Sequence, residues 1–322
     1  MKRLKEIINI LENNNDFLIL SHKDPDGDSI GSQLALYSFL KELGKSPYIL
    51  NQDEVPRKYR FLKNYNRIKH NLPGGFRYSV VIFLDSPTIE RVGDVRKLVD
   101  LNKLIVNIDH HPSNSYFGNC LFVDPNSSST AEIIYRLILE MGIKIGKERA
   151  ASLYAGILTD TGRFKFPNTT PRAFFISAEL IKEGIDPSFI AEEVYSKKSP
   201  QELKLLGMVL STFTISDGVG IIDLTKEMLQ SIEKKSLDTE GLADYVLTVE
   251  GIKIGLLFKE QNDGKVKVSF RSKGNGINVS DLAANFGGGG HETAAGCVLE
   301  CSIKEAKNRI LSLIGKRLGR KL

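Results

Sequence analysis

Acidic residues and histidines recur in this sequence directly after short apolar runs, where their side chains could bind cations together. The set comprises His22, Asp26 and Asp28 after FLILS, Asp85 at the end of VVIFLD, Asp109, His110 and His111 after LIVN, and Asp160 in GILTDTGRF. Clustered carboxylates repel one another, so such a site is costly unless cations occupy it. Mixed carboxylate and imidazole ligands favour Mn²⁺, with Mg²⁺, Co²⁺ or Fe²⁺ as alternatives. Two such cations about 3.5–4 Å apart are the usual apparatus for phosphoryl hydrolysis.

The distribution of histidines favours a metal site over the simpler interpretation that these aspartates are turn or cap residues. An aspartate at the end of a strand is most often a turn former or a helix cap, and Asp28 alone could cap a helix that begins at Ser29. The chain has only five histidines, however, and four of them lie in acidic or glycine-rich segments, whereas His70 lies in an uninformative polar stretch. This clustering favours a metal site over a set of unrelated caps.

Four consecutive glycines (287–290) indicate a second candidate site near the C-terminus. A glycine run lets the backbone approach a ligand closely and direct its N–H groups at an anion, although taken alone it is more typical of a flexible turn. His291 follows the run directly, and Arg271 ends an alternating strand upstream, where its planar guanidinium could hold phosphate oxygens. Together these residues favour a phosphate-binding site.

Apolar segments alternate with amphipathic ones over the first half of the chain, which predicts strands alternating with helices. Buried strands are expected at FLILS (17–21), PYILN (47–51), VVIFLD (80–85) and LIVNID (104–109), and helices at 4–11, 29–44, 129–142, 148–158 and 171–184. We therefore expect an α/β fold with a mostly parallel sheet flanked by helices. Ligands of such sheets bind at the carboxyl ends of the strands.

Length and pattern together predict two domains. Residues 1–191 form the expected catalytic, metal-binding domain, 192–212 a charged connector interrupted by Pro200, and 213–322 a smaller α+β domain for the substrate. Within the last domain, IKIGLLFKEQ and KVKVSFRS flank a turn at NDG (262–264), which predicts a β-hairpin. An amphipathic helix is expected at the C-terminal end of this domain.

The composition is that of an ordinary globular protein, and it restricts the partners. A net charge of +5, from 44 basic and 39 acidic residues, lacks the strongly basic profile of a protein that binds long duplex DNA, but it suits a short anionic substrate. No apolar run reaches the roughly 18 residues of a membrane span, and no signal peptide is evident. Three cysteines without CxxC spacing (Cys120, Cys297 and Cys301) are typical of free buried thiols. We therefore expect a cytoplasmic protein that does not bind membranes.

The order of the motifs resembles that of the DHH phosphoesterase superfamily. HKDPDGD (22–28), VIFLD (81–85), DHH (109–111) and GILTDTGRF (156–164) are similar to its four successive motifs, and SFRS (269–272) with GGGGHETAAG (287–296) resembles its associated DHHA1 domain. One such motif is weak evidence, but five in the right order are specific and span most of the chain. The length and the C-terminal motif are most similar to the standalone bacterial nanoRNases (oligoribonucleases) and 3′-phosphoadenosine-5′-phosphate (pAp) phosphatases, a subgroup that includes cyclic di-AMP phosphodiesterases.

The resemblance implies a role for each candidate residue, with the active site in the cleft between the two domains. One cation would be held by His22, Asp26 and Asp85, and the other by Asp28, Asp85, His110 and Asp160, which makes Asp85 the bridge. Asp109 would orient a ring nitrogen and His111 would contact the scissile phosphate, so the expected catalytic residues are Asp85, Asp109 and His111. The terminal phosphate of the substrate would be bound by Arg271, Ser272, His291 and the backbone of Gly288, Gly289 and Gly290.

The function that the resemblance implies is manganese-dependent hydrolysis of short oligonucleotides, from dinucleotides such as pApA and pGpG to pentanucleotides, into 5′-mononucleotides. Hydrolysis of pAp to AMP would use the same site. Cleavage of cyclic di-AMP is the alternative within this chemistry, and a non-catalytic nucleotide- or RNA-binding module is the alternative from another class. The intact ligand set argues against the module, because a protein without activity is expected to lose at least one ligand. The ranking of natural substrates and the formation of a homodimer stay open.

Overall fold

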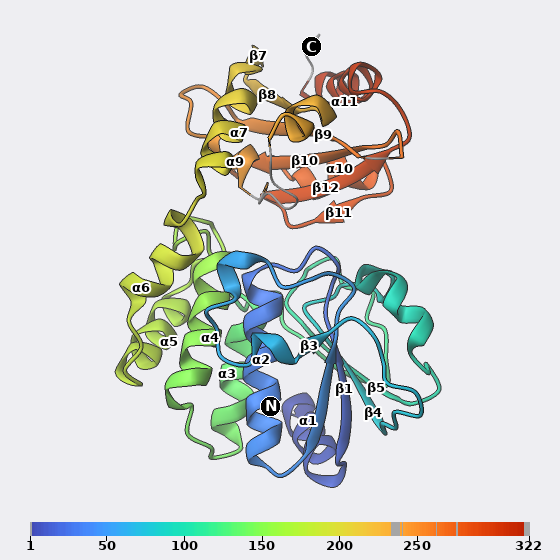
Figure 1. Cartoon of the computed structure of the whole chain (residues 1–322), viewed down its shortest axis with the longest axis vertical. Coiled ribbons are helices and arrows are strands. Elements are labelled where there is room, and N and C mark those ends of the chain that lie inside the picture. The colour runs from blue at the N-terminus through green and yellow to red at the C-terminus, as the bar shows by residue number, and fades with distance from the viewer. Residues whose placement is uncertain (1, 233–238, 240, 262, 275, 319–322) are drawn as a thin grey trace. The chain divides into compact units, whose positions relative to one another are not determined.

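The computed structural model describes residues 2–232, 239, 241–261, 263–274 and 276–318 (Figure 1). The chain forms two compact units, residues 1–197 and 198–322. Within the described ranges, no helix is both long enough and apolar enough to cross a lipid bilayer.

Unit 1 contains a six-stranded parallel sheet, which confirms the predicted fold class. Its strands are β1 (Asp16–Leu20), β2 (Ser46–Leu50), β3 (Ile68–Lys69), β4 (Val80–Leu84), β5 (Leu104–Asp109) and β6 (Cys120–Val123), in the order β3-β2-β1-β4-β5-β6. Because all neighbours pair in parallel, the carboxyl ends of the strands lie at one edge of the sheet. The strands predicted from apolar runs are β1, β2, β4 and β5, whereas β3 and β6 are too short to stand out in the sequence.

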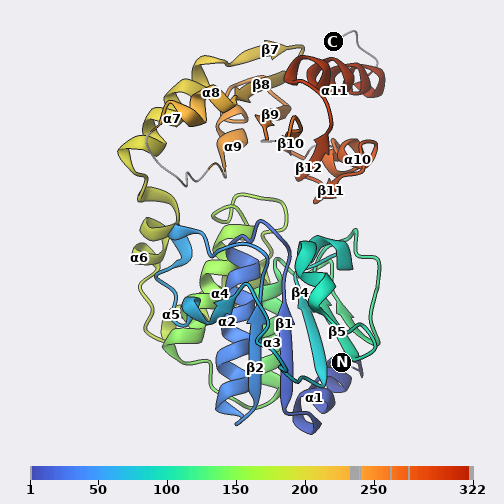
Figure 2. The ribbon, with the colours of Figure 1, turned by 45° about the vertical axis from the view of Figure 1, so that its right-hand side comes forward.

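The helices of unit 1 are α1 (Lys2–Asn13), α2 (Gly27–Glu42), α3 (Thr130–Glu140), α4 (Gly146–Asp160), α5 (Pro171–Lys182) and α6 (Pro187–Ala191), with 3-10 helices η1 (Arg57–Tyr59), η2 (Tyr65–Arg67) and η3 (Ile89–Leu98). The first five, α1 to α5, correspond to the predicted helical segments. Figures 1 and 2 show α2, α3 and α4 side by side against the sheet. The apolar residues of α3 lie largely in the core, since Ile133, Ile134 and Leu137 are buried.

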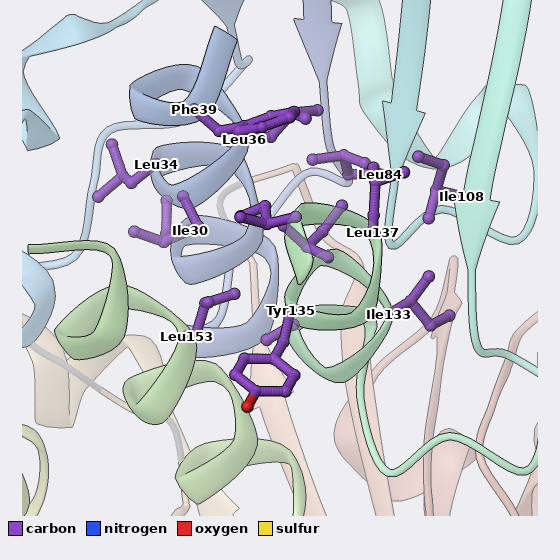
Figure 3. Packing of buried hydrophobic residues seen from close by; sticks show 14 of the residues in the cluster. Ile30, Leu34, Leu36, Phe39, Leu84, Ile108, Ile133, Tyr135, Leu137 and Leu153 are labelled. Atoms are coloured by element: carbon purple, nitrogen blue, oxygen red, sulfur yellow. The ribbon is translucent and has the colours of Figure 1, made fainter. Parts of the chain in front are cut away.

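Alternate side chains of the strands fill two cores, one on each face of the sheet. Phe17 and Ile19 of β1 are buried with side chains of α1 to α4, and Leu18 and Leu20 are buried on the other face with residues of η3. Figure 3 shows Leu84 and Ile108 from the ends of β4 and β5 among side chains of α2 and α3. Burial on both faces explains why these strands are continuous apolar runs.

Two glycines allow α2 and α4 to approach each other closely. A Cβ at Gly31 would stand 2.2 Å from the carbonyl oxygen of Ser152 on α4, and one at Gly156 would stand 3.3 Å from Cα of Asp28 on α2. Any side chain at either position would therefore push the helices apart. The close approach matters for the site because α2 carries Asp28 near its start and α4 ends at Asp160.

Unit 2 contains a second, mixed sheet and five helices among its described residues. The strands are β7 (Thr214–Ser216), β8 (Val219–Leu224), β9 (Ile254–Glu260), β10 (Val266–Ser272), β11 (Gly289–Gly290) and β12 (Ala294–Leu299), in the order β11-β12-β10-β9-β8-β7. The helices are α7 (Pro200–Ser211), α8 (Lys226–Gln230), α9 (Leu242–Val246), α10 (Val279–Ala284) and α11 (Ile303–Leu318). Strands β9 and β10 form the predicted antiparallel hairpin, although Asn262 of its expected turn lies outside the described residues.

The segment 192–212, interpreted from its sequence as a connector, is mostly helical. It contains a single π-helical turn, η4 (Glu192–Ser196), followed by α7. Pro200 occupies the first turn of α7, behind a capping box of Ser199 and Glu202, so this proline starts a helix. Leu205 and Val209 of α7 are buried in an apolar cluster with side chains of β8, which places the helix in unit 2.

Candidate metal centre

The acidic residues and histidines predicted as ligands meet at the carboxyl edge of the parallel sheet. The strand ends supply His22, Asp85, Asp109, His110 and His111, the N-terminal turn of α2 and its cap supply Asp26 and Asp28, and the last residue of α4 is Asp160. This is the edge at which open α/β sheets bind ligands. The donor atoms fall into groups that converge within 4.8 Å of one another.

His22, Asp26 and Asp85 form the first group. Nε2 of His22 lies 3.6 Å from Oδ1 of Asp26 and 3.4 Å from Oδ2 of Asp85. The other ring nitrogen, Nδ1, lies 2.8 Å from the carbonyl oxygen of Lys23, which favours the tautomer with its proton on Nδ1. The lone pair of Nε2 then faces the two carboxylates, as the ligand of a shared cation requires.

His110, Asp28 and Asp160 form the second group, and Asp85 contributes to it as well. Nε2 of His110 lies 3.8 Å from Oδ2 of Asp28, 3.6 Å from Oδ1 of Asp85 and 3.5 Å from Oδ2 of Asp160. Nδ1 of His110 lies 3.3 Å from the carbonyl oxygen of Ser127. One oxygen of Asp85 therefore faces each group, which is the arrangement of a bridging carboxylate.

The N-terminal turn of α3 holds Asp28 through backbone N–H groups. Oδ2 accepts a hydrogen bond of 2.6 Å from the N–H of Thr130, and Oδ1 accepts one of 2.8 Å from the N–H of Ala131. The hydroxyl of Thr130 also donates to Oδ1 of Asp85 over 3.1 Å. Because a helix N-terminus favours a neighbouring anion, α3 stabilises both carboxylates while it fixes their orientation.

Asp109 holds the ring of His111. Its Oδ1 lies 2.7 Å from Nδ1 of His111 and also accepts a hydrogen bond of 2.8 Å from the backbone N–H of His110. Its Oδ2 accepts a hydrogen bond of 2.6 Å from the side-chain amide of Asn114. The ring nitrogen that Asp109 orients therefore belongs to His111, which presents Nε2 on the other side of its ring.

The backbone of Asp85 adopts a left-handed conformation, with a φ of 52°. Such a conformation costs a residue with a side chain about 1–2 kcal/mol, although aspartate tolerates it better than most. It turns the chain sharply after Leu84, the last residue of β4, and sets the carboxylate between His22 and His110. Strain of this kind persists where the surrounding structure and its function require it.

The titration behaviour of the centre reflects an excess of buried negative charge. Burial raises the pKa of Asp28 well above its usual range, and the charges of Asp85 and Asp160 raise it further. Burial, Asp85 and Asp26 do the same to the pKa of Asp160. Burial alone would lower the pKa of His22, but Asp26 and Asp85 outweigh it and raise that pKa well above its usual value.

The donor chemistry fits divalent cations. Oxygen and imidazole nitrogen atoms from separate elements converge within 4.8 Å of one another at this edge of the sheet. Burial and the neighbouring carboxylates raise the pKa values of Asp28 and Asp160, as expected where negative charges are crowded together. A bound cation would relieve this repulsion.

The predicted phosphate-binding residues lie in unit 2. Nε of Arg271 donates a hydrogen bond of 2.9 Å to Oδ1 of Asp244 on α9, and the guanidinium also reaches the carbonyl oxygen of Phe270. Ser272 is buried, and its hydroxyl lies 3.0 Å from the carbonyl oxygen of Ile277. The hydroxyl of Ser272 thus holds the neighbouring loop in this structure.

The glycine run closes α10 and forms β11. The N–H of Gly288 donates to the carbonyl oxygen of Ala283, so this amide ends the helix. A Cβ at Gly288 would stand 2.2 Å from the carbonyl oxygen of Gly296, so only glycine fits there. His291 begins the turn that leads to Ala294, and Ala294 is the cross-strand partner of Arg271. Arg271 and His291 therefore lie at the same end of this sheet.

Several polar residues that support the centre escaped the sequence analysis. Asn168 donates to Oδ2 of Asp160 over 3.0 Å and to the carbonyl oxygen of Ser128 over 2.9 Å. Thr130 and Asn114 have the similar roles given above. The only signal was the run NSSST before α3, which is typical of an ordinary helix cap.

Two family profiles match the sequence. The profile of the DHH family, N-terminal domain, matches residues 16–157, and that of the DHHA1 domain matches residues 226–320. The first interval contains all the predicted ligands except Asp160, and the second contains Arg271 and the glycine run.

Several relatives align with almost the whole chain. The bifunctional oligoribonuclease and PAP phosphatase NrnA of Thermus thermophilus is 35% identical, over 99% of this chain and 95% of the relative. The protein of the same name from Bacillus subtilis is 31% identical, over 90% and 91%. The crystal structure of an exopolyphosphatase-related protein from Bacteroides fragilis superposes with a TM-score of 0.88 at 28% identity, and covers 98% of this chain and 96% of that one.

Proposed function

The chain belongs to the DHH family of phosphoesterases, and from this premise we propose that it is a two-metal phosphodiesterase that hydrolyses short oligonucleotides to 5′-mononucleotides. The observation that carries the proposal is the position of Asp85, with one oxygen toward each group of donor atoms. The names of the relatives from Thermus thermophilus and Bacillus subtilis support oligonucleotides and pAp as the two substrate classes.

The centre would hold two cations. The first would be bound by His22, Asp26 and Asp85, and the second by Asp28, Asp85, His110 and Asp160. The mixture of carboxylates and imidazoles favours Mn²⁺ over a zinc site, which more often contains cysteine. Bound there, divalent cations make a water molecule acidic enough to attack at neutral pH and neutralise charge on the phosphate.

His111 would act on the phosphate directly. Asp109 accepts a hydrogen bond from Nδ1–H of its ring, so the doubly protonated ring would donate a hydrogen bond from Nε2 to a phosphate oxygen. A donor fixed in advance lowers the barrier because no reorientation is needed as charge develops. In this scheme Asp85 and His111 touch the reacting groups, and Asp109 positions His111.

Unit 2 would bind the terminal phosphate and thereby select short substrates. Asp244 holds Nε of Arg271, which pre-orients the guanidinium for phosphate oxygens. His291 and the backbone of Gly289 and Gly290 would complete the phosphate site, while the absence of a side chain at Gly288 lets this loop pack closely against β12. The buried hydroxyl of Ser272 would support the loop beside them.

A turnover panel in Mn²⁺ tests the proposal. It compares pApA, pGpG, a pentanucleotide, a long RNA, pAp and cyclic di-AMP, with the products identified by chromatography. We expect the dinucleotides and pAp to be hydrolysed fastest and the long RNA slowest. If cyclic di-AMP is hydrolysed fastest, it is the preferred substrate in place of the short oligonucleotides. If none of these compounds is hydrolysed, the protein is a non-catalytic binding module.

The variant Arg271→Met tests the role of unit 2. We expect it to raise KM for pApA by at least about tenfold, the loss of one charge-assisted contact. Cleavage of bis-p-nitrophenyl phosphate, which has no terminal phosphate, should change little. Equal losses on both substrates would contradict the selection of substrates by Arg271.

A further inference from the structure

Glu132 is a buried carboxylate in the first turn of α3, and it belongs to neither group of proposed ligands. Its side chain is 0% exposed, and Oε1 lies 2.5 Å from Nε of Arg172 at the start of α5. Its Oε2 accepts hydrogen bonds from the N–H and the hydroxyl of Ser128, over 3.1 and 2.8 Å. A buried charge is costly unless it is both paired and hydrogen-bonded, and Glu132 meets both conditions.

The segment that Glu132 holds, residues 127–131, is also the segment that supports the metal centre. We call it the ligand-holding segment. The carbonyl oxygen of Ser127 faces Nδ1 of His110, and the N–H groups of Thr130 and Ala131 bind the carboxylate of Asp28. The segment makes all of these contacts through backbone atoms. Its backbone conformation therefore determines the orientation of the ligand side chains.

Arg172 also helps to hold the backbone that contacts Asp160, the remaining ligand of the second group. Its NH2 donates a hydrogen bond of 3.1 Å to the carbonyl oxygen of Asn126, just before the ligand-holding segment. Within the segment, the carbonyl oxygen of Ser128 accepts from the amide of Asn168, and this same amide contacts Oδ2 of Asp160. Displacing Ser128 would therefore disturb Asp160 through Asn168.

We propose that Glu132 and Arg172 are positioning residues for the second cation site, and that they act through the ligand-holding segment. Glu132, paired with Arg172, holds Ser128 in place by hydrogen bonds. The segment in turn orients the side chains of Asp28, His110 and Asp160. This inference rests on the proposed metal-dependent function. It predicts that the first site, formed by His22, Asp26 and Asp85, depends less on the pair. The contacts of His22 and Asp26 arise from other elements, while the segment contacts Asp85 through the side-chain hydroxyl of Thr130.

Titration of Mn²⁺ alone into the metal-free full chain, followed by calorimetry, tests the proposal. The variants are Glu132→Gln, Arg172→Met and Arg172→Lys, with thermal unfolding of each metal-free protein to establish that it is folded. The matched control is Lys182→Met, which breaks an exposed ion pair with Glu179 on the same helix, α5. A role in folding alone would change the melting temperature and leave the Mn²⁺ affinity of the folded protein unchanged.

We expect Glu132→Gln and Arg172→Met to weaken one of two Mn²⁺ sites about 10–100-fold, the usual effect of losing a residue that orients a ligand. The value of kcat for pApA should fall with it, while KM changes little. Arg172→Lys keeps the positive charge and should recover most of the affinity, and Lys182→Met should behave as the wild type.

Two outcomes would overturn the proposal and can be told apart. If the wild type binds two Mn²⁺ ions and folded Arg172→Met binds both with wild-type affinity, the positioning role is wrong while the proposed function stands. If the wild type itself binds no Mn²⁺, the proposed function fails first and this inference fails with it.

Discussion

Oδ1 of Asp109 lies 2.7 Å from Nδ1 of His111, so the carboxylate that ends β5 is bonded to the second histidine after it. The ring of the first, His110, is oriented instead by the carbonyl oxygen of Ser127. Adjacent histidines thus have separate supports, and their roles can be separated by mutation.

The variant Asp109→Asn should impair turnover and spare metal binding. An asparagine cannot accept hydrogen bonds with both side-chain atoms, so it loses its contact with either His111 or Asn114. We expect kcat for pApA to fall about 10–100-fold, as for other residues that orient a functional histidine. The affinity for Mn²⁺ should stay near that of the wild type. Loss of Mn²⁺ binding without a change in kcat would reverse the assignment.

Metal removal should make the protein sensitive to the charge of Asp160. Burial and the charges of Asp85 and Asp26 raise the pKa of this carboxyl, so its contribution to stability is present below the unfolded value near pH 4 and is lost as the pH rises through the folded value. Asp160→Asn should therefore melt higher than the wild type at pH 7 in EDTA, by about 2–4 °C for each kcal/mol. The difference should shrink below about pH 4.

In the presence of added Mn²⁺ the wild type should melt at a higher temperature than Asp160→Asn. The wild type gains stability from any ion that binds only the folded state, and Asp160→Asn lacks one of the proposed ligands. A metal-free Asp160→Asn protein that melts no higher than the wild type at pH 7, or one that gains equally from Mn²⁺, would contradict the account of this carboxylate.

The close approach of α2 and α4 can be tested with a methyl group. In Gly156→Ala the new Cβ would stand 2.7 Å from Cβ of Ala131 and 3.0 Å from Oδ1 of Asp28. Overpacking of this kind costs about 1–3 kcal/mol, and here it should also weaken Mn²⁺ binding. The control is Gly207→Ala in α7, where nothing lies within 4 Å of the added Cβ. This control should be stabilised by about 0.4–1 kcal/mol in chemical denaturation.

The cysteines should differ in their reactivity. Burial raises the pKa of the Cys120 and Cys297 thiols to about 11, whereas Cys301 is only half-buried. Iodoacetamide at pH 8 should therefore modify Cys301 first in the native protein, and the other two only after unfolding, as mass spectrometry would show. Rapid native modification of Cys120 would contradict its burial in unit 1.

The parallel sheet and the gathering of the ligands were predictable because both follow from local patterns. Continuous apolar runs such as 80–84 identify strands buried on both faces, and parallel strands necessarily bring residues like Asp85 and Asp109 to one edge. Asp160 could be placed there only through the family resemblance. Its position depends on the crossing of α2 and α4, which no single segment of the sequence encodes.

Supporting residues were not predictable for the same reason. Asn168 and Arg172 follow α4 by several residues, and their partners Ser128 and Glu132 lie 40 residues earlier. Pro200 led to a different error of interpretation: a proline in a charged stretch suggested a break, but in the first turn of a helix it begins α7. Pairing across distant segments and the position of a proline within a helix are decided by the tertiary fold.

The left-handed backbone at Asp85 has a consequence for protein engineering. A glycine at this position would adopt the same conformation without strain, so Asp85→Gly relaxes the turn after β4 and removes the proposed bridging carboxylate in one step. A search for thermostable variants that rewards folding alone would thus be drawn toward this change and would discard the reaction. At position 85 a glycine would favour stability, whereas the proposed activity requires the aspartate. Directed evolution of this enzyme should therefore keep Asp85 unchanged.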